Sequence, residues 1–209
     1  MTEPASLRAH ATNASGNIRD PLAGELIGPG KRFETETILV AGRPMQVFKG
    51  APRTLAGIFE QAQALGNRPM VKHDGAALSY SEVFARSARL TCLLKEQFGV
   101  GKGTRVAIAM ENRCEWIIAL IAVTAAGGVA ALINSRSSAD EMNHAISAVG
   151  CSVAILDCQR ADITEAASCD APWLQIVIDD VDLTIAGCSD EEIAIRPVPV
   201  EPGDGAVIL

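Results

Sequence analysis

Two polar segments have side chains that could bind a ligand, and each directly follows an apolar stretch of strand length. Asn112 comes after residues 106–110. Arg136 comes after residues 129–133, at the end of an Asn-Ser-Arg stretch. Ligands of open α/β sheets bind outside the carboxyl ends of the strands, and an arginine there can hold a phosphate through two parallel hydrogen bonds. The alternatives are a turn and cap role for Asn112 and a solvated or ion-paired loop role for Arg136.

The residue types that perform covalent or metal chemistry are not arranged for it. His73 and His144 are isolated, and no Ser/His/Asp set is apparent. The cysteines contain no Cys-x-x-Cys pair, which argues against a zinc site. The glycines of residues 99–103 lie between an expected helix and an expected strand, whereas a nucleotide fingerprint opens a helix after a strand. We therefore predict neither a catalytic residue nor a metal ligand in this chain.

Composition narrows the class of protein. The chain has 209 residues, 48% of them hydrophobic and 21% charged, which is typical of a soluble globular protein. An aromatic content of 4% and a formal net charge of −7 disfavour a nucleic-acid partner. The N-terminal residues lack the apolar core of a signal peptide, and the unpaired cysteine pattern is typical of a reducing compartment. We expect a cytoplasmic protein.

Residues 116–133 carry no formal charge, and about 18 apolar residues can span a bilayer as one helix. The Gly127-Gly128 pair interrupts this run where a soluble helix would end. We therefore predict a buried helix over residues 116–126, a buried strand over residues 129–133, and no transmembrane segment.

Hydrophobic periodicity and capping signals predict an alternation of strands and helices. Ser79 with Glu82, and Ser138 with Glu141, form capping boxes that begin helices. The other expected elements are hairpins over residues 33–49 and 70–80, a helix over 55–65, strands over 106–110, 153–156, 174–178, 193–195 and 205–209, and a short helix over 163–168. This order predicts an α/β class: a layered, Rossmann-like subdomain with a mostly parallel sheet, helices on both faces, and a small N-terminal β-hairpin. Residues 1–32 are expected to form a mobile leader.

Several stretches together carry a resemblance to a known family. They are Leu78-Ser-Tyr-Ser-Glu82, Gly99-Val-Gly-Lys-Gly-Thr-Arg-Val-Ala107, Asn112-Arg-Cys-Glu-Trp116, Ala126-Gly-Gly-Val129 and Asn134-Ser-Arg136. In order and spacing they resemble the front of an adenylate-forming (AMP-binding) enzyme, in the acyl-CoA synthetase branch. The resemblance is good over residues 54–157 and weaker to residue 209. It implies that residues 33–209 are the N-terminal portion of such a domain, ending before the ATP phosphate-binding loop.

The resemblance implies a two-step ligase that uses ATP, Mg²⁺, a small carboxylic acid and CoA. In this family an Asn-Pro-Arg stretch has an arginine that can contact CoA phosphates, so Arg136 is expected to have that role, in a loop that Ser135 makes less rigid than proline would. The 209-residue chain alone is expected to be inactive. An amino-acid-activating domain that loads a carrier protein and a truncated, non-catalytic binding module remain alternatives. The carboxylic acid and the formation of a homodimer stay open.

Overall fold

The computed structural model describes residues 25–40, 42–167, 173–185 and 197–209. The chain divides into two compact units, residues 1–52 and residues 53–209. Most of the predicted leader lies outside the described residues. Its last part, residues 25–32, contains a helical turn at residues 25–27, and a backbone hydrogen bond joins the N–H of Phe33 to the carbonyl of Leu26.

The first unit contains the predicted N-terminal hairpin. Strand β1 (Thr35–Val40) pairs antiparallel with β2 (Arg43–Phe48) in a register that ends at Val40 opposite Arg43. Gly42, in the turn, has a φ of 77°, a conformation that glycine adopts without steric cost.

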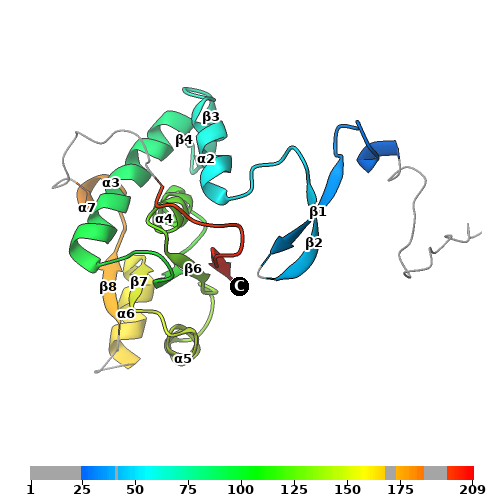
Figure 1. Cartoon of the computed structure of the whole chain (residues 1–209). Coiled ribbons are helices and arrows are strands. Elements are labelled where there is room, and N and C mark those ends of the chain that lie inside the picture. The colour runs from blue at the N-terminus through cyan, green and yellow to red at the C-terminus, as the bar shows by residue number, and fades with distance from the viewer. Residues whose placement is uncertain (1–24, 41, 168–172, 186–196) are drawn as a thin grey trace, which may run out of the picture. The chain divides into compact units, whose positions relative to one another are not determined.

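The second unit alternates helices and strands, as predicted (Figure 1). Its elements are α2 (Leu55–Gln63), β3 (Pro69–His73), β4 (Ala76–Ser79), α3 (Tyr80–Phe98), β5 (Arg105–Ala109), α4 (Cys114–Ala125), β6 (Val129–Leu132), α5 (Ala139–Val149), β7 (Val153–Leu156), α6 (Cys158–Ala167), β8 (Leu174–Val177), α7 (Val181–Thr184) and β9 (Val207–Ile208). Helix α6 begins earlier than predicted, and β9 is shorter. The strand predicted at residues 193–195 lies outside the described residues.

The described residues of this unit form a five-stranded parallel sheet of order β8-β7-β5-β6-β9. Strand β5 is central: Ala107 lies opposite Ala131 of β6 and opposite Ala154 of β7. Because the strands are parallel, their carboxyl ends lie at one edge of the sheet. The loops that follow β5, β6 and β7 are therefore neighbours.

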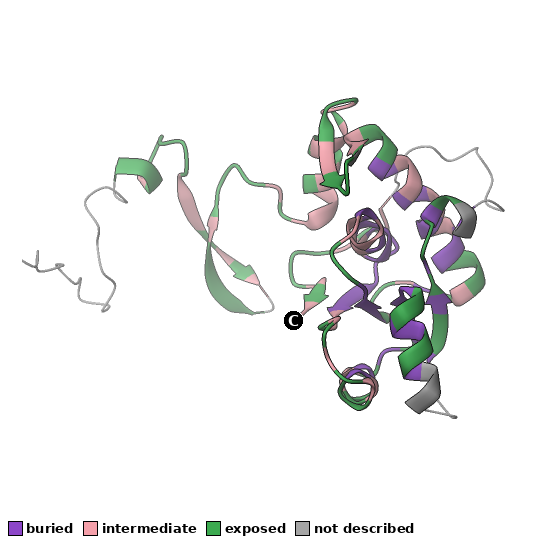
Figure 2. Cartoon of the chain, turned by 180° about the vertical axis from the view of Figure 1, so that it is seen from behind, coloured by how far each residue is buried: buried purple, intermediate pink, exposed green. Residues whose placement is uncertain are grey.

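Alternation along the strands divides the core into two layers. On β5, Val106 and Ile108 pack in a large cluster with α3 and α4, whereas Ala107 and Ala109 pack in a smaller cluster with Met142 of α5 and other residues from α5 and α6. Successive side chains of a strand point to opposite faces, so helices cover both faces of the sheet. In Figure 2 the buried colour lies on the central strands of the sheet, whereas β8 and β9 are mostly exposed or intermediate. The predicted α/β class is confirmed.

Local signals in the sequence explain where the helices begin and end. The Ser79 and Ser138 side chains accept hydrogen bonds from the backbone N–H of Glu82 and Glu141, and both predicted capping boxes are complete. Helices α3 and α5 end at Gly99 and Gly150, which adopt the left-handed conformation that commonly ends helices.

Helix α4 and strand β6 are separated by Gly127-Gly128, as the apolar run predicted. Gly127 has a φ of 83°, and its carbonyl accepts the backbone N–H of Gly103 at 3.0 Å. In the described part of the chain, no helix is both long and apolar enough to cross a membrane. The run is therefore a helix and a strand of the core.

Candidate functional site

Polar side chains gather in the loops that follow the carboxyl ends of the parallel strands. Glu111 follows β5, Ser135 follows β6, Asp157 follows β7 and Asp179 follows β8. Hydrogen bonds from two arginines connect these loops. Interconnected polar groups thus lie at the edge where an open α/β sheet binds its ligands, and we treat this edge as the candidate site.

Arg160, in the first turn of α6, connects three of these loops. Its Nε donates to the Ser135 carbonyl at 2.9 Å, its Nη1 to Asp157 Oδ2 at 3.2 Å, and its Nη2 to Glu111 Oε1 at 3.2 Å. The Arg160 and Asp157 side chains are only 8% and 6% exposed, so their charges compensate one another away from water. Asp157 also accepts the backbone N–H groups of Glu111 at 3.0 Å and of Arg160 at 2.9 Å.

Arg113 makes a second connection, between the loop after β5 and the loop after β8. Its Nε donates to Glu115 Oε2 at 2.9 Å, its Nη1 donates to Asp179 Oδ1 at 3.3 Å, and its Nη2 donates to the Asp179 carbonyl. Burial opposes the charge of Arg113, but the hydrogen bond with Glu115 and the neighbouring carboxylates raise its pKa. The guanidinium therefore stays charged in both its ion pairs.

Asp179 is also linked to the start of α6. Its Oδ1 accepts the backbone N–H of Cys158 at 3.1 Å. Hydrogen bonds from the thiol and the backbone N–H of Cys158 lower the pKa of Asp179, and the same contact raises the pKa of the Cys158 thiol. At neutral pH this exposed cysteine is consequently held as a thiol, which is a poor nucleophile.

The predicted site residue Asn112 lies between two anchored residues. The backbone of Glu111 is held by Asp157, and the side chain of Arg113 is held by Asp179. Asn112 itself is exposed. It does not cap α4, because the N-cap is Arg113, which makes no side-chain capping hydrogen bond. The capping alternative for Asn112 is therefore wrong, and a ligand-contacting role stays a prediction.

The predicted site residue Arg136 is exposed in the neighbouring loop. Its backbone N–H donates to the side-chain Oδ1 of Asn134 at 3.0 Å, and the N–H of Ser137 donates to the carbonyl of Asn134 at 3.2 Å. Asn134 thus forms the local turn that brings Arg136 to the surface. Since β5 and β6 are adjacent and parallel, Asn112 and Arg136 lie in neighbouring loops at one edge of the sheet.

Arg160 and Asp157 were not predicted as site residues from the sequence. One signal was present: Asp157 directly follows an apolar strand, as Glu111 and Asn134 do, and Arg160 stands one helical turn later. In a sequence, a charged pair three residues apart at the start of a helix is typical of an exposed helix surface. Only the three-dimensional arrangement shows that the arginine is buried and reaches the preceding loops.

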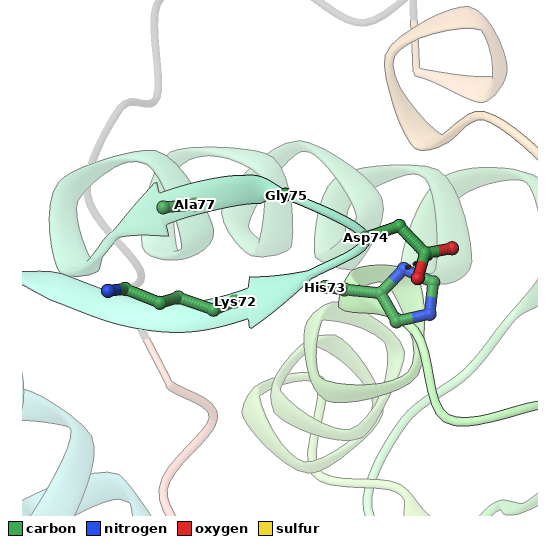
Figure 3. Close-up of a pocket in the computed structure, with 5 residues that line it drawn as sticks. All are labelled: Lys72, His73, Asp74, Gly75 and Ala77. Atoms are coloured by element: carbon green, nitrogen blue, oxygen red, sulfur yellow. Dashed lines mark ion pairs between the residues drawn. The ribbon is translucent and has the colours of Figure 1, made fainter.

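A surface pocket of about 420 Å³ lies elsewhere, at the tip of the β3–β4 hairpin, and is lined by Lys72, His73, Asp74, Gly75 and Ala77. Figure 3 shows His73 and Asp74 side by side at the tip and Lys72 directed away from them. His73 Nδ1 and Asp74 Oδ2 are 3.8 Å apart, and the two side chains are 42% and 90% exposed. These polar groups do not converge on one point, so the strand ends remain the better candidate site.

Known proteins share this fold. The N-terminal subdomain of Klebsiella oxytoca NpsA, in complex with 3-hydroxybenzoyl-AMSN, superposes with a TM-score of 0.62 and 23% identity over 75% of this chain and 37% of that chain. The long-chain-fatty-acid-CoA ligase FadD1 of Archaeoglobus fulgidus superposes with a TM-score of 0.63 and 15% identity over 75% of this chain and 34% of that chain. At these identities the likenesses show the fold.

Sequence relatives include a feruloyl-CoA synthase from Amycolatopsis sp, 33% identical over 131 residues, or 63% of this chain and 25% of the relative. A long-chain-fatty-acid–CoA ligase from Escherichia coli O157:H7 is 25% identical over 54% of this chain and 20% of the relative. The chain thus spans about a quarter of the length of the first relative. A family model for AMP-binding enzymes matches residues 58–209, and the match, over most of the chain, shows that the chain belongs to the AMP-binding enzyme family.

Proposed function

We propose that these residues supply the N-terminal portion of an acid–thiol ligase that joins a carboxylic acid to CoA through an acyl-adenylate. The observation that carries the proposal is the family match over residues 58–209 on a parallel sheet whose strand ends present Asn112 and Arg136. The similarity to a feruloyl-CoA synthase favours CoA as the acceptor. We place the protein in the cytoplasm, where ATP and CoA are available.

In this proposal Arg136 binds a phosphate of CoA. Its backbone is fixed by Asn134, and its side chain is exposed at a strand end, so a planar guanidinium is available for a phosphate. Asn112 contacts the bound substrate or nucleotide from the adjacent loop. The acyl transfer itself requires a thiol to attack the adenylate carbonyl and release AMP, and we assign none of the described side chains to that step.

The family resemblance also implies Mg²⁺, but the described residues do not fit this ion. They contain no cluster of three or more histidine, cysteine or acidic side chains that could hold a metal. The carboxylates of Asp157 and Glu111 at the strand ends are already engaged by Arg160. We therefore assign none of the described residues to Mg²⁺.

The second candidate function is activation of an amino acid for transfer to a carrier protein. One observation favours it: surfactin synthase subunit 1 of Bacillus subtilis is 26% identical over 77% of this chain, although this covers 4% of that protein. The two candidates differ in the acceptor thiol and in the acid. Both require formation of an acyl-adenylate.

The test is acid-dependent exchange of labelled pyrophosphate into ATP, followed by detection of the acyl-CoA product by mass spectrometry. It is carried out on the product of the longest open reading frame that contains these codons, with ferulate, a long-chain fatty acid and amino acids as substrates. The 209-residue chain is assayed in parallel. We expect exchange and a CoA thioester from the longer product, and neither from the 209-residue chain.

Two outcomes would contradict the proposal. Exchange that requires an amino acid and yields no CoA thioester would favour the carrier-loading function. Exchange catalysed by the 209-residue chain alone would show that it holds a complete adenylation site, against our expectation of inactivity.

A further inference from the structure

Every nitrogen of the Arg160 guanidinium donates a hydrogen bond in this structure. The acceptors are the Ser135 carbonyl, Asp157 Oδ2, Gln159 Oε1 and Glu111 Oε1, at 2.9 to 3.2 Å. They come from the loops after β5, β6 and β7 and from α6 itself. One planar group thus sets the spacing of the ends of the three middle strands of the sheet, β7, β5 and β6.

Burial of this charge needs an explanation. The Arg160 side chain is 8% exposed, and a buried ion pair commonly stabilises a fold no better than apolar residues of the same volume. The hydrogen bonds of Arg160, however, are directed at loops and not at the core clusters. A fork of fixed geometry can hold several acceptors at fixed distances, which apolar residues cannot do.

The hydrogen bond from Arg160 to Ser135 anchors the middle of the loop after β6. The loop is fixed at its start, where the N–H of Ile133 donates to Ile108 at 3.0 Å, and at its end by the Ser138 capping box. Between these points, Arg160 Nε donates a hydrogen bond to the Ser135 carbonyl. Ser135 directly precedes Arg136, so this bond sets where the Arg136 side chain starts.

We propose that Arg160 is a positioning residue that holds the loops carrying Arg136 and Asn112 in their binding geometry. It acts on Arg136 through the Ser135 carbonyl and on Asn112 through Glu111 and Asp157. The functional part of this inference rests on the ligase function proposed above, whereas the positioning part is a property of the 209-residue chain.

The positioning part is tested by amide hydrogen exchange in the 209-residue chain, resolved by NMR. The variant is Arg160→Lys, which keeps a buried positive charge opposite Asp157 but loses the fork. We expect faster exchange of the Arg136 and Glu111 amides, whose acceptors are the Asn134 and Asp157 side chains. The amide of Ile178, which donates to the Leu156 carbonyl, should exchange at an unchanged rate.

A matched control and a second variant separate positioning from general destabilisation. Arg86→Lys removes another arginine fork, the one on Asp182 at 2.9 and 2.8 Å, from helix α3, and should leave the loop amides unchanged. Glu111→Gln is safe for the fold because the Glu111 side chain is 65% exposed. Glu111→Gln should accelerate hydrogen exchange of the amides at positions 136 and 111 by less than Arg160→Lys does. Unchanged exchange at both amides in both variants would overturn the proposal, whatever the protein catalyses.

The functional part is tested in the longer ligase product. Arg160→Lys should raise KM for CoA by about ten- to a hundredfold, on the scale expected when a binding group is misplaced by about 1 Å. Pyrophosphate exchange without CoA should fall by less than CoA use, because it involves Asn112 and not Arg136, and the loop of Asn112 keeps the bond from the Glu111 N–H to Asp157. A general loss of folding would reduce both to the same extent.

A double-mutant cycle decides whether Arg160 acts through Arg136. In an Arg136→Ala background, Arg160→Lys should raise KM for CoA by no more than about twofold. Independent, multiplicative effects would overturn the inferred route. If the wild-type longer product shows no acid-dependent pyrophosphate exchange, the ligase proposal fails. The positioning role of Arg160 is then still decided by the amide hydrogen-exchange measurement.

Discussion

The backbone N–H of Glu111 donates to the side-chain Oδ2 of Asp157 at 3.0 Å. The last backbone pair between β5 and β7 is Ala109 opposite Leu156, so this bond continues the contact between the two strands beyond their ladder. A side chain that follows one strand thereby fixes the loop that follows the next. The geometry of the candidate site is an extension of the sheet, and this relationship underlies the predictions about its loops.

Replacement of Arg136 by alanine should impair CoA use and spare adenylate formation. A hydrogen bond to a charged group contributes about 1.5–3 kcal/mol, so CoA use in the longer ligase product should weaken by about ten- to a hundredfold. Arg136→Lys should recover part of this loss, because lysine keeps the charge without the planar fork. KM for CoA and pyrophosphate exchange without CoA are the two measurements. An equal loss in both would indicate a structural arginine instead.

Replacement of Ile121 by alanine should destabilise the fold strongly. Ile121 is fully buried in the larger core cluster, whereas its neighbour Leu120 is only partly buried. Truncation of a fully buried isoleucine costs about 2–5 kcal/mol. Urea unfolding of the 209-residue chain should show this loss for Ile121→Ala and a clearly smaller one for Leu120→Ala. Equal losses would mean that α4 presents a different face to the core.

Gly127 should tolerate alanine less well than Gly103, although both have a positive φ, of 83° and 81°. A Cβ at Gly103 would meet nothing within 4 Å, whereas a Cβ at Gly127 would lie 3.2 Å from the backbone nitrogen of Lys102. Gly103→Ala should therefore cost only the backbone strain, about 1–2 kcal/mol. Gly127→Ala should cost about 1–3 kcal/mol more through overpacking. Thermal unfolding of the two variants gives the difference, and equal midpoints would contradict the close approach.

The stability of the fold should fall in acid because of its capping boxes. Hydrogen bonds from the backbone N–H and hydroxyl of Ser79 lower the pKa of Glu82 below its ordinary value of 4.5, and Ser138 does the same for Glu141. A carboxylate with a lowered folded-state pKa contributes stability above its unfolded pKa. That contribution is lost as the pH falls from about 4.5 through the folded-state value.

The pH effect can be measured by urea unfolding between neutral pH and pH values below about 4.5. Glu82→Gln and Glu141→Gln keep an acceptor for the capping bond but cannot titrate, so the decline in unfolding free energy at low pH should be shallower. Glu96→Gln, at the exposed end of α3, is the matched control for loss of one carboxylate. If the unfolding free energy of both cap variants falls as steeply at low pH as that of the wild type, the capping boxes do not cause the loss of stability in acid.

Much of the fold was predictable because the signals that define it are local. The capping boxes at Ser79 and Ser138 correctly predicted the starts of α3 and α5, and both helices end at glycines, at positions 99 and 150. The start of α6 was placed too late, because Asp157 accepts the backbone N–H of Arg160 and begins the helix at residues with little apolar periodicity. In α4, apolar residues on all sides concealed which face is buried, so the partial exposure of Leu120 could not be predicted.

The candidate site was predictable only in its position. The strand-end rule placed Asn112 and Arg136 at one edge of the sheet, and the parallel pairing of β5 with β6 confirms that placement; their binding roles stay predictions. The Arg160 network could not be predicted, because its partners Glu111 and Ser135 lie 49 and 25 positions away in the sequence. Long-range polar contacts of this kind leave no periodic signal.

The parallel sheet also has a kinetic consequence. Each strand pairing closes a chain segment that contains a whole helix, so folding depends on distant contacts and is expected on the order of milliseconds to seconds. Strand β9 joins with only two residue pairs, Ala130 opposite Val207 and Ala131 opposite Ile208. Because the β6–β9 contact closes the longest segment for the fewest hydrogen bonds, β9 should dock after β7, β5 and β6 and separate before them during unfolding.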